Sequence, residues 1–183
     1  PRSMMKYMIS ALGLCLSASV MQASVHPIEV ISHDKSVTLY LHFDEGRAPL
    51  HEQRISSLID QGFYHPNDHD MTFHRVVPGF VVQTGDPTAT GAGGSGQNIP
   101  AEFNDHKCQA GSLGMARAQD VNSADSQFFI CLTDQGCAHL TGQYTQLGWV
   151  SLQPDDDEQA SVTSELLRVL SGIKQGSQVI VSS

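Results

Sequence analysis

The sequence predicts a mainly β protein, either a barrel or a sandwich, that carries two helices. Short stretches of alternating apolar and polar residues recur along the chain, and the clearest places four apolar side chains on one face of a strand: Val37, Leu39, Leu41 and Phe43. The 183 residues include 16 Gly and 8 Pro, a content typical of a turn-rich fold. Only two segments show helical periodicity, so a regular alternation of strands and helices is not expected.

The strands are expected to be short and joined by turns. A strand around residues 28–31 precedes a turn at 33–35, which leads into the strand 37–43. Further strands are expected at residues 72–77, 80–84, 112–117, 126–132, 147–151 and 178–181. Residues 84–100 are rich in Gly and turn-forming residues, and we expect them to form a loop.

Two amphipathic segments are expected to be helical. Residues 49–61 place Ile55, Leu58 and Ile59 on one face, and Gly62 follows as a stop. Residues 161–170 gather their apolar side chains in the same way: Val162, Leu166, Val169 and Leu170. The acidic residues 155–158 come just before this second helix, where negative charge is favourable.

The charge and hydropathy of the chain exclude some classes of partner. The formal net charge is −9 and the ten Lys and Arg are scattered, whereas a nucleic-acid-binding surface needs clustered cations. No apolar run in the body of the chain reaches the length of a membrane span. No repeat or linker divides residues 24–183, which we therefore expect to form a single domain.

Residues 1–23 have the features of a secretory signal peptide. Lys6 supplies a positive charge, residues 8–20 form a short apolar stretch, and Ala23 is the small residue expected before a cleavage point. Residues 1–3 precede the first Met and are treated as an extraneous remnant. A lipoprotein signal ending at Cys15 is disfavoured, because bulky Leu14 stands where such a motif needs a small residue. We therefore predict export to the periplasm with cleavage after Ala23, and no stable membrane anchor.

Three cysteines remain in residues 24–183: Cys108, Cys131 and Cys137. Export permits a disulfide, but an odd number leaves at least one thiol unpaired. Cys131 lies in an apolar run, which favours a buried small residue rather than a bridge. No pair has the Cys-x-x-Cys spacing of zinc and redox sites.

Two local patterns are interpreted as ordinary loops. Gly91, Gly93 and Gly96 match Gly-x-Gly-x-x-Gly, but Pro100 follows instead of a helix, so a flexible surface loop is expected rather than a dinucleotide site. A polar cluster without the ligand spacing of known zinc motifs is likewise expected to be a turn: His65, Asp68, His69 and Asp70.

The strongest chemical signal lies in three strand-like segments. Residues 73–83 place Arg75 and Gln83 among apolar residues, with Phe80 beside them. Residues 111–117 add a strand that ends in small residues. In the segment 126–130, Gln127 and Phe129 share one side because strand side chains alternate. The aromatic residues alone are compatible with an ordinary core, but a guanidinium in such surroundings requires partners or a task.

These segments resemble the signature blocks of the cyclophilin family of peptidyl-prolyl isomerases. The matching residues are 73–86, 111–116, 126–130 and 139–148, in the family's order, within a resemblance that covers roughly residues 25–183. The resemblance implies a closed antiparallel cyclophilin-like β-barrel capped by two α-helices, with a groove that takes an Xaa-Pro segment. It implies three catalytic residues, Arg75, Gln83 and Phe80. It also implies that the groove is lined by His74, Val81, Met115, Ala116, Arg117, Gln127, Phe129, His139, Leu140 and Tyr144.

The chemistry of prolyl isomerisation suits these residue types. Rotation about the prolyl bond faces a barrier of about 18–20 kcal/mol because of amide resonance, and no bond has to break. A donor to the prolyl nitrogen weakens that resonance, most effectively in a site kept dry by Phe80 and Phe129. We therefore expect an isomerase that assists protein folding, with Arg75 polarising the prolyl amide and with no cofactor or metal.

The same residues set the expectations for partners and alternatives. Proline-containing polypeptides are the expected substrates, and the chain is expected to be a monomer. His139 replaces a tryptophan that favours cyclosporin binding in the family, so weak cyclosporin binding is expected. A second hypothesis is a non-catalytic peptide-binding chaperone module. It is disfavoured because binding alone does not require Arg75 and Gln83. A third hypothesis is a metal-dependent hydrolase whose metal is bound by the histidines.

Overall fold

A computed structural model describes residues 24–44, 46–65, 70–156 and 162–183. The expected signal segment 1–23, residues 66–69 of the expected polar cluster and the expected start of the second helix at residue 161 lie outside the described residues. Among the described residues, no helix is both long and apolar enough to span a membrane.

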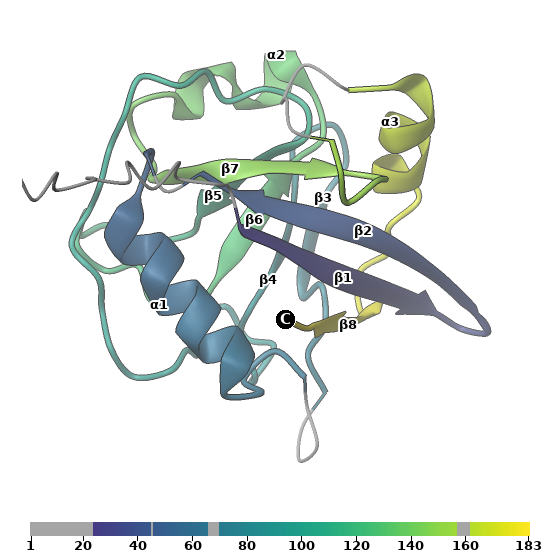
Figure 1. Cartoon of the computed structure of the whole chain (residues 1–183), viewed down its shortest axis with the longest axis horizontal. Helices are drawn as coiled ribbons and strands as arrows, with labels where there is room; N and C mark the ends of the chain where they lie inside the picture. Colours follow the sequence, from purple (N-terminus) through teal and green to yellow (C-terminus); the bar gives the residue numbers. More distant parts are fainter. Residues whose placement is uncertain (1–23, 45, 66–69, 157–161) are drawn as a thin grey trace, which may run out of the picture.

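The described chain is mainly β, as the alternating pattern predicts. Its strands are β1 (Ser24–Ser32), β2 (Lys35–Phe43), β3 (Arg75–Val77), β4 (Val81–Thr84), β5 (Ser112–Met115), β6 (Phe128–Cys131), β7 (Gln146–Ser151) and β8 (Gln178–Val181). They form one antiparallel sheet in the order β3-β4-β6-β5-β7-β2-β1-β8, which curls around an apolar interior (Figure 1). A curled antiparallel sheet agrees with the expected barrel and excludes alternating strand–helix units.

The two edges of the sheet are joined by the segment that precedes β3. The backbone N–H of Val179 in β8 donates to the carbonyl oxygen of Met71 at 2.7 Å, and Thr72 pairs with Gln178. The strand expected over residues 72–77 is therefore divided, because its first residues pair with β8 and only Arg75–Val77 pairs with β4. The hydrogen bonds between this segment and β8 join the two edges of the sheet and close the barrel.

Two amphipathic helices lie on opposite sides of the curled sheet (Figure 1). They are α1 (Pro49–Asp60), within the predicted segment 49–61, and α3 (Ser164–Ser171), which overlaps the predicted segment 161–170 and ends one residue later. Both bury apolar side chains in the main core, which receives Ile55, Leu58 and Ile59 from α1 and Leu166 and Leu170 from α3. The structure adds a short helix α2 (Asp134–Cys137) and a 3-10 turn η1 (Ala138–Leu140), which are too short to leave a periodic signal.

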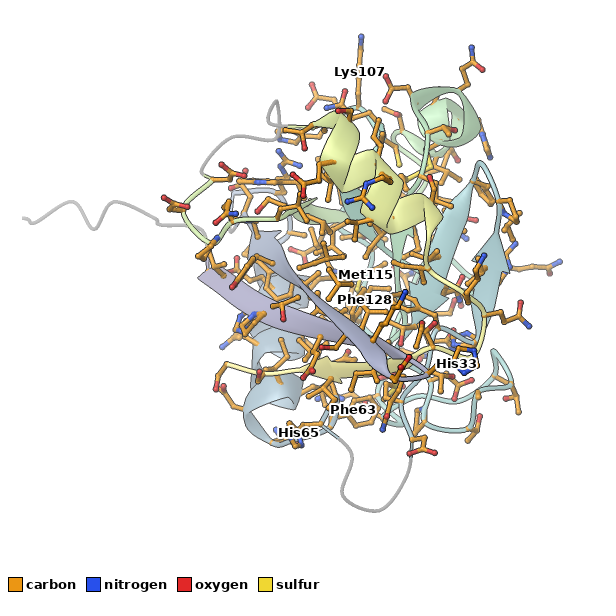
Figure 2. The ribbon with its side chains drawn as sticks, turned by 90° about the vertical axis from the view of Figure 1, so that its right-hand side faces the viewer. His33, Phe63, His65, Lys107, Met115 and Phe128 are labelled. Atoms are coloured by element: carbon orange, nitrogen blue, oxygen red, sulfur yellow. A yellow bond between two sulfur atoms is a disulfide. The ribbon has the colours of Figure 1, made fainter. Side chains whose placement is uncertain are left out.

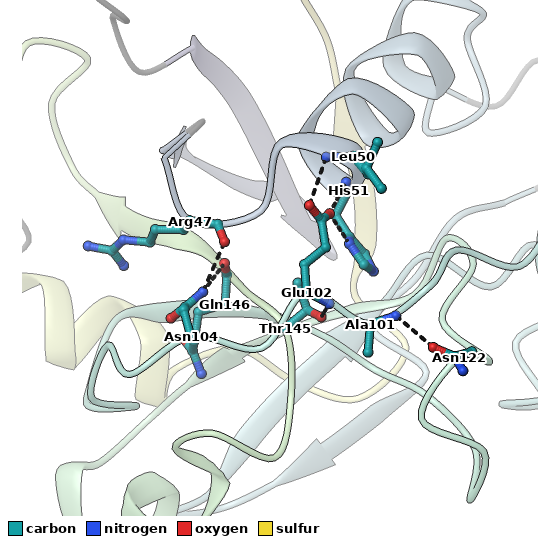
Figure 3. Close-up of polar contacts among 9 residues, drawn as sticks. All are labelled: Arg47, Leu50, His51, Ala101, Glu102, Asn104, Asn122, Thr145 and Gln146. Atoms are coloured by element: carbon teal, nitrogen blue, oxygen red, sulfur yellow. Dashed lines mark hydrogen bonds and ion pairs between the residues drawn. The ribbon is translucent and has the colours of Figure 1, made fainter.

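The first turn of α1 is capped by a carboxylate from a distant part of the chain (Figure 3). Ala48 offers no side-chain cap, and Glu102 instead accepts from the backbone N–H groups of Leu50 (3.1 Å) and His51 (2.8 Å). The backbone N–H of Glu102 in turn donates to the Thr145 hydroxyl oxygen at 3.0 Å. A negative charge at a helix N-terminus is favourable, so Glu102 ties α1 to the segment just before β7.

Large side chains fill the interior. Figure 2 shows Met115 and Phe128 in the middle of the molecule, and both are 1% exposed. The Tyr64 hydroxyl is also buried and donates to the carbonyl oxygen of Ser126 at 2.6 Å, which meets its need for a partner. On β7, Trp149 stacks on the His42 imidazole with ring centroids 5.1 Å apart. The packing of Trp149 is therefore structural.

Candidate active site

A cavity of about 780 Å³ lies on the sheet face opposite the main core, between β3–β4 on one side and η1 on the other. Its lining includes all but two of the residues expected in the groove: His74, Arg75, Phe80, Val81, Gln83, Ala116, Arg117, Phe129, His139, Leu140 and Tyr144. We call this cavity the groove, the β3–β4 side the arginine wall, and the α2–η1 side the helical wall. The structure thus brings together residues from four separate parts of the chain.

Strand alternation decides which side chains reach the groove. On β4, Val81 and Gln83 face the groove and Val82 joins the main core. On β6, Phe129 faces the groove and Phe128 joins the core. Each of these strands therefore serves both the groove and the core.

The same alternation corrects the expectation for Met115. Met115 on β5 is 1% exposed and belongs to the main core, not to the groove lining. Gly114, the preceding residue, is the one on the groove side, and a Cβ there would collide with the Phe129 ring. Gly114 therefore leaves the space that the Phe129 ring occupies beside the groove.

Arg75 is held at the groove by its partner strand. Arg75 and Gln83 are direct cross-strand partners, and Arg75 Nη1 donates to Gln83 Oε1 at 3.4 Å. The guanidinium carbon lies 5.9 Å from the centroid of the Phe80 ring, within the range of a cation–π contact. The turn between β3 and β4 contains Pro78 and Gly79, and Gly79 adopts φ +74°, a conformation that glycine accepts without strain.

A hydrogen-bonded relay continues from Gln83 into the glycine-rich loop. Gln83 Nε2 donates to Gln127 Oε1 at 2.8 Å, and Gln127 Nε2 donates to the carbonyl oxygens of Gly91 and Gly93, both at 2.9 Å. Gln127 is 9% exposed and lies between the groove and a neighbouring cavity of about 700 Å³, so it acts on the groove through Gln83. The relay orients the amide that meets Arg75.

Asp86 anchors the far end of the relay. Its carboxylate accepts four backbone N–H groups: Thr88 (2.8 Å), Thr90 (3.1 Å), Gly91 (2.6 Å) and Gly93 (3.1 Å). Burial raises the pKa of Asp86, but the hydrogen bonds from Thr88, Gly93 and Gly91 outweigh it and hold the pKa at about 2. The glycine-rich loop was expected to be a flexible surface loop; it does lie at the surface, but Asp86 organises it through these hydrogen bonds and Gly91 lines the groove.

His74 stands beside Arg75 in the groove lining. Burial lowers the pKa of His74, and the nearby Asp86 carboxylate opposes that shift without cancelling it. The imidazole is therefore neutral at pH 7. A neutral His74 adds no second positive charge next to the Arg75 guanidinium.

The end of the groove near β5 is built from stacked rings and one cation. The Phe129 and Tyr144 rings meet edge to face with centroids 5.8 Å apart. Arg117 lies over the Tyr144 ring at 4.6 Å and donates to the carbonyl oxygen of Gln143 at 2.8 Å. Arg117 therefore connects the end of β5 to the chain after η1.

The helical wall carries the rest of the apolar surface. Leu140, 6% exposed, and His139 both come from η1, and the His139 ring stacks on Phe80 with centroids 5.7 Å apart. Thr133 caps α2 by accepting from the Gly136 N–H at 2.9 Å. Its hydroxyl also donates to the Gly79 carbonyl oxygen at 2.6 Å, which ties the helical wall to the turn of the arginine wall.

Several groove residues were not expected from the sequence. Ala89, Thr90 and Gly91 reach the groove because Asp86 folds their loop inward, and Gln143 and Gln175 complete the lining. An Asp that precedes Thr88 and Thr90 at short spacing is typical of a side chain that hydrogen-bonds the backbone two residues ahead. This pattern in the sequence could have predicted that Asp86 folds the loop inward.

The structure corrects the expectation for Cys131. Cys131 forms a disulfide with Cys137, with the two Cα atoms 6.2 Å apart, and Cys108 is a buried free thiol. The apolar run around Cys131 did predict its burial, but not the approach of α2, which brings Cys137 to it. In the part of the chain that the structure describes, these cysteines are also the one group of three potential metal ligands, so no cluster of histidines and carboxylates lies in the groove.

On the outside of the curled antiparallel barrel, the groove places apolar rings and aliphatic side chains beside the Arg75 guanidinium, an arrangement that can accommodate a polypeptide segment. The family model for cyclophilin type peptidyl-prolyl cis-trans isomerases matches residues 28–155. The chain therefore belongs to the cyclophilin-type peptidyl-prolyl cis-trans isomerase family.

Individual relatives agree with this assignment. A peptidyl-prolyl cis-trans isomerase of Synechococcus elongatus is 41% identical over 138 residues, which are 75% of this chain and 88% of that protein. Peptidyl-prolyl cis-trans isomerase B of Bacillus subtilis is 42% identical over 57% of this chain and 69% of its own length. A cyclophilin-type isomerase of Cryptosporidium parvum shares the fold, with a TM-score of 0.62 at 24% identity over 87% of this chain and 96% of that structure.

Proposed function

We propose that the chain catalyses cis–trans isomerisation of Xaa-Pro bonds in polypeptides, with Arg75 as the donor to the prolyl nitrogen. The observation that carries the proposal is the position of Arg75. Its guanidinium lies at the groove, over the Phe80 ring, and is oriented by Gln83 from the neighbouring strand. A fixed cation next to an apolar surface is what a rotating prolyl amide requires.

The proposed mechanism follows from amide electronics. Twisting the prolyl bond breaks its resonance and leaves a lone pair on the nitrogen, which a guanidinium N–H stabilises in the twisted form alone. Val81, Phe129 and Leu140 offer an apolar surface to the proline ring and exclude water from it. Each 1.36 kcal/mol of preference for the twisted amide accelerates the reaction about tenfold.

A relative supports the choice of ligand. The Cryptosporidium parvum isomerase has also been solved in the presence of the dipeptide Ala-Pro, with a TM-score of 0.62 and 23% identity to this chain. A proline-containing segment in the groove of the present chain is consistent with that structure.

The test is isomerisation of a short Ala-Pro peptide by the purified protein, with a metal chelator present throughout. We expect fast exchange in the wild type and a fall of about 10²–10³-fold in kcat/KM for Arg75→Ala. Arg168→Ala is the matched control, because Arg168 is exposed on α3, and its rate should equal the wild type.

The alternatives predict different results in this assay. A folded wild type that binds the peptide but gives only the uncatalysed rate would contradict the proposal and indicate the non-catalytic binding module. Cleavage of the peptide that occurs without the chelator and stops when it is added would indicate the metal-dependent hydrolase instead.

We further propose that the protein is exported to the periplasm and cleaved after Ala23. The sequence of residues 6–23 supports this, and so does the Cys131–Cys137 disulfide, because disulfides persist in oxidising compartments. N-terminal sequencing of the protein from a cell fraction tests it, and an uncleaved protein in the cytosol would contradict it.

The proposal extends to partners. We expect a monomer in solution, which light scattering measures, and weak inhibition by cyclosporin because His139 occupies the groove rim. Nanomolar inhibition of the purified protein would contradict the second expectation.

A further inference from the structure

Three cysteines from separate segments meet behind the helical wall. Cys131 ends β6, Cys137 ends α2, and Cys108 lies in the chain that leads to β5. Their exposed fractions are 0%, 0% and 2%, and all three sulfur atoms lie within 4.8 Å of one another. The proposed mechanism uses none of these sulfur atoms.

The free thiol lies in contact with the disulfide. Cys131 and Cys137 are bonded, and the Sγ atom of Cys108 lies 3.0 Å from the Sγ atom of Cys131. A thiol next to a disulfide sulfur is the reactant pair of thiol–disulfide exchange, which proceeds by attack of the thiolate on that sulfur. An inert buried cysteine does not need this contact.

We propose that Cys108, Cys131 and Cys137 form a thiol–disulfide exchange centre with two disulfide forms, Cys131–Cys137 and Cys108–Cys131. In the exchange, the Cys108 thiolate attacks the sulfur of Cys131, the bond from Cys131 to Cys137 breaks, and Cys137 leaves as a thiolate. The proton given up by Cys108 is balanced by the proton that Cys137 takes. One disulfide is lost and one is formed, so no oxidant or reductant is consumed.

The exchange centre is continuous with the groove. The three cysteines belong to one apolar cluster with Val81, Phe129 and Leu140, and the Sγ atom of Cys137 lies 3.4 Å from the carbonyl oxygen of Phe80. Any change of bonding within this cluster therefore acts directly on the groove lining.

The two forms hold the helical wall differently. In the Cys131–Cys137 form, a covalent bond ties α2 to β6 just before the rim residues His139 and Leu140. In the Cys108–Cys131 form, α2 keeps only non-covalent ties, such as the Thr133 hydrogen bond to the turn at Gly79. We expect the rim to be looser in that form. This consequence rests on the proposed isomerase function, whereas the exchange itself does not.

Burial sets the rate of the exchange. It raises the pKa of the Cys108 thiol, so the thiolate is scarce at neutral pH. The exchange should therefore be slow at pH 7 and accelerate as the pH rises. Acid stops it, which allows the two forms to be trapped and counted.

The test is disulfide mapping of the full chain. The oxidised protein is incubated without added redox reagent at pH 7, 8 and 9, quenched in acid, and unfolded. Free thiols are then alkylated before digestion and mass spectrometry. We expect both Cys131–Cys137 and Cys108–Cys131 peptides, with the second appearing faster at higher pH. Cys108→Ser should contain Cys131–Cys137 alone. A wild type that keeps only Cys131–Cys137 at every pH would overturn the proposal.

Two locked variants extend the test to the groove. Cys137→Ser in a glutathione redox buffer should form Cys108–Cys131, and two free thiols there would also overturn the proposal. With an Ala-Pro peptide, we expect a KM severalfold higher for Cys137→Ser than for Cys108→Ser, with kcat unchanged. Equal KM values would overturn the effect on the groove. If the wild type itself lacks isomerase activity, the proposed function fails while the disulfide map still decides the exchange.

Discussion

The two walls of the groove are built on different physical principles. The arginine wall is a polar relay, in which Arg75, Gln83, Gln127 and the glycine-rich loop are joined by hydrogen bonds that end on the buried Asp86. The helical wall is a short turn held by apolar contacts and a disulfide. The relay orients the Arg75 guanidinium, and catalysis by a hydrogen-bond donor depends on that orientation. The helical wall instead offers apolar surface area, on which the binding of a proline ring depends. Damage to the first should lower kcat, and damage to the second should raise KM.

Asp86→Ala should have the largest effect on the arginine wall. It leaves four buried or partly buried N–H groups without their acceptor, so we expect a loss of about 3 kcal/mol in the free energy of unfolding. Urea denaturation measures it. Asp134→Ala is the matched control on the helical wall, because exposed Asp134 accepts a single N–H, from Ala110. An equal loss in both variants would contradict the comparison.

Acid should weaken the same anchor. The folded-state pKa of Asp86 is about 2, below its usual 3.8, so its charge stabilises the fold above pH 3.8 and the stabilisation is lost as the pH falls through 2. The shift corresponds to about 2 kcal/mol. Denaturation of the wild type and Asp86→Asn between pH 5 and pH 2 checks it, and the two curves should converge at low pH.

Gln83→Ala should lower kcat about ten- to a hundredfold with little change in KM, because Arg75 loses the acceptor that orients it. The two constants are measured with an Ala-Pro peptide. Gln61→Ala is the control, since the Gln61 side chain is exposed beyond the end of α1 and does not line the groove. A rise in KM alone would show that Gln83 binds substrate and does not position Arg75.

Leu140→Ala, on the helical wall, should raise KM and leave kcat nearly unchanged. It removes apolar surface from the groove and leaves the relay intact, so we expect KM to rise about tenfold while kcat stays near the wild-type value. Peptide titration measures both constants. A fall in kcat without a change in KM would contradict the division of roles.

Mild acid should give the smallest effect, spread over the whole fold. Burial lowers the pKa of His26, His42, His51 and His74 from the usual 6.5. The unfolded chain then binds more protons than the folded one below pH 6.5, so the free energy of unfolding should fall as the pH drops from 7 to 5. Thermal unfolding across this range measures it. A rise in stability towards pH 5 would contradict the lowered pKa of these four imidazoles.

The sequence was sufficient for the parts of this protein whose signals are local. Alternation located the strands, as in β2, where Leu39, Leu41 and Phe43 all enter the core. The 3.6-residue period located both long helices. The motif blocks around Arg75 and Phe129 pointed to residues that the structure does bring to one groove.

Other features depend on contacts between segments far apart in the chain, which no local pattern encodes. Whether Met115 or Gly114 faces the groove depends on the register of β5 against its neighbours, since one residue of shift exchanges the two faces of a strand. The four-residue helix α2 brings Cys137 to Cys131, and the cap of α1 comes from Glu102.

The sequence by itself determined the element types, the family and the residues with chemical potential, because side-chain periodicity and motif composition are properties of neighbouring residues. Tertiary structure alone decided that Asp86 anchors a relay ending at Arg75, and that three cysteines share one apolar cluster. The physical reason is that hydrogen bonds and sulfur contacts act over a few ångströms in space. Only the closed barrel brings such distant residues within that range.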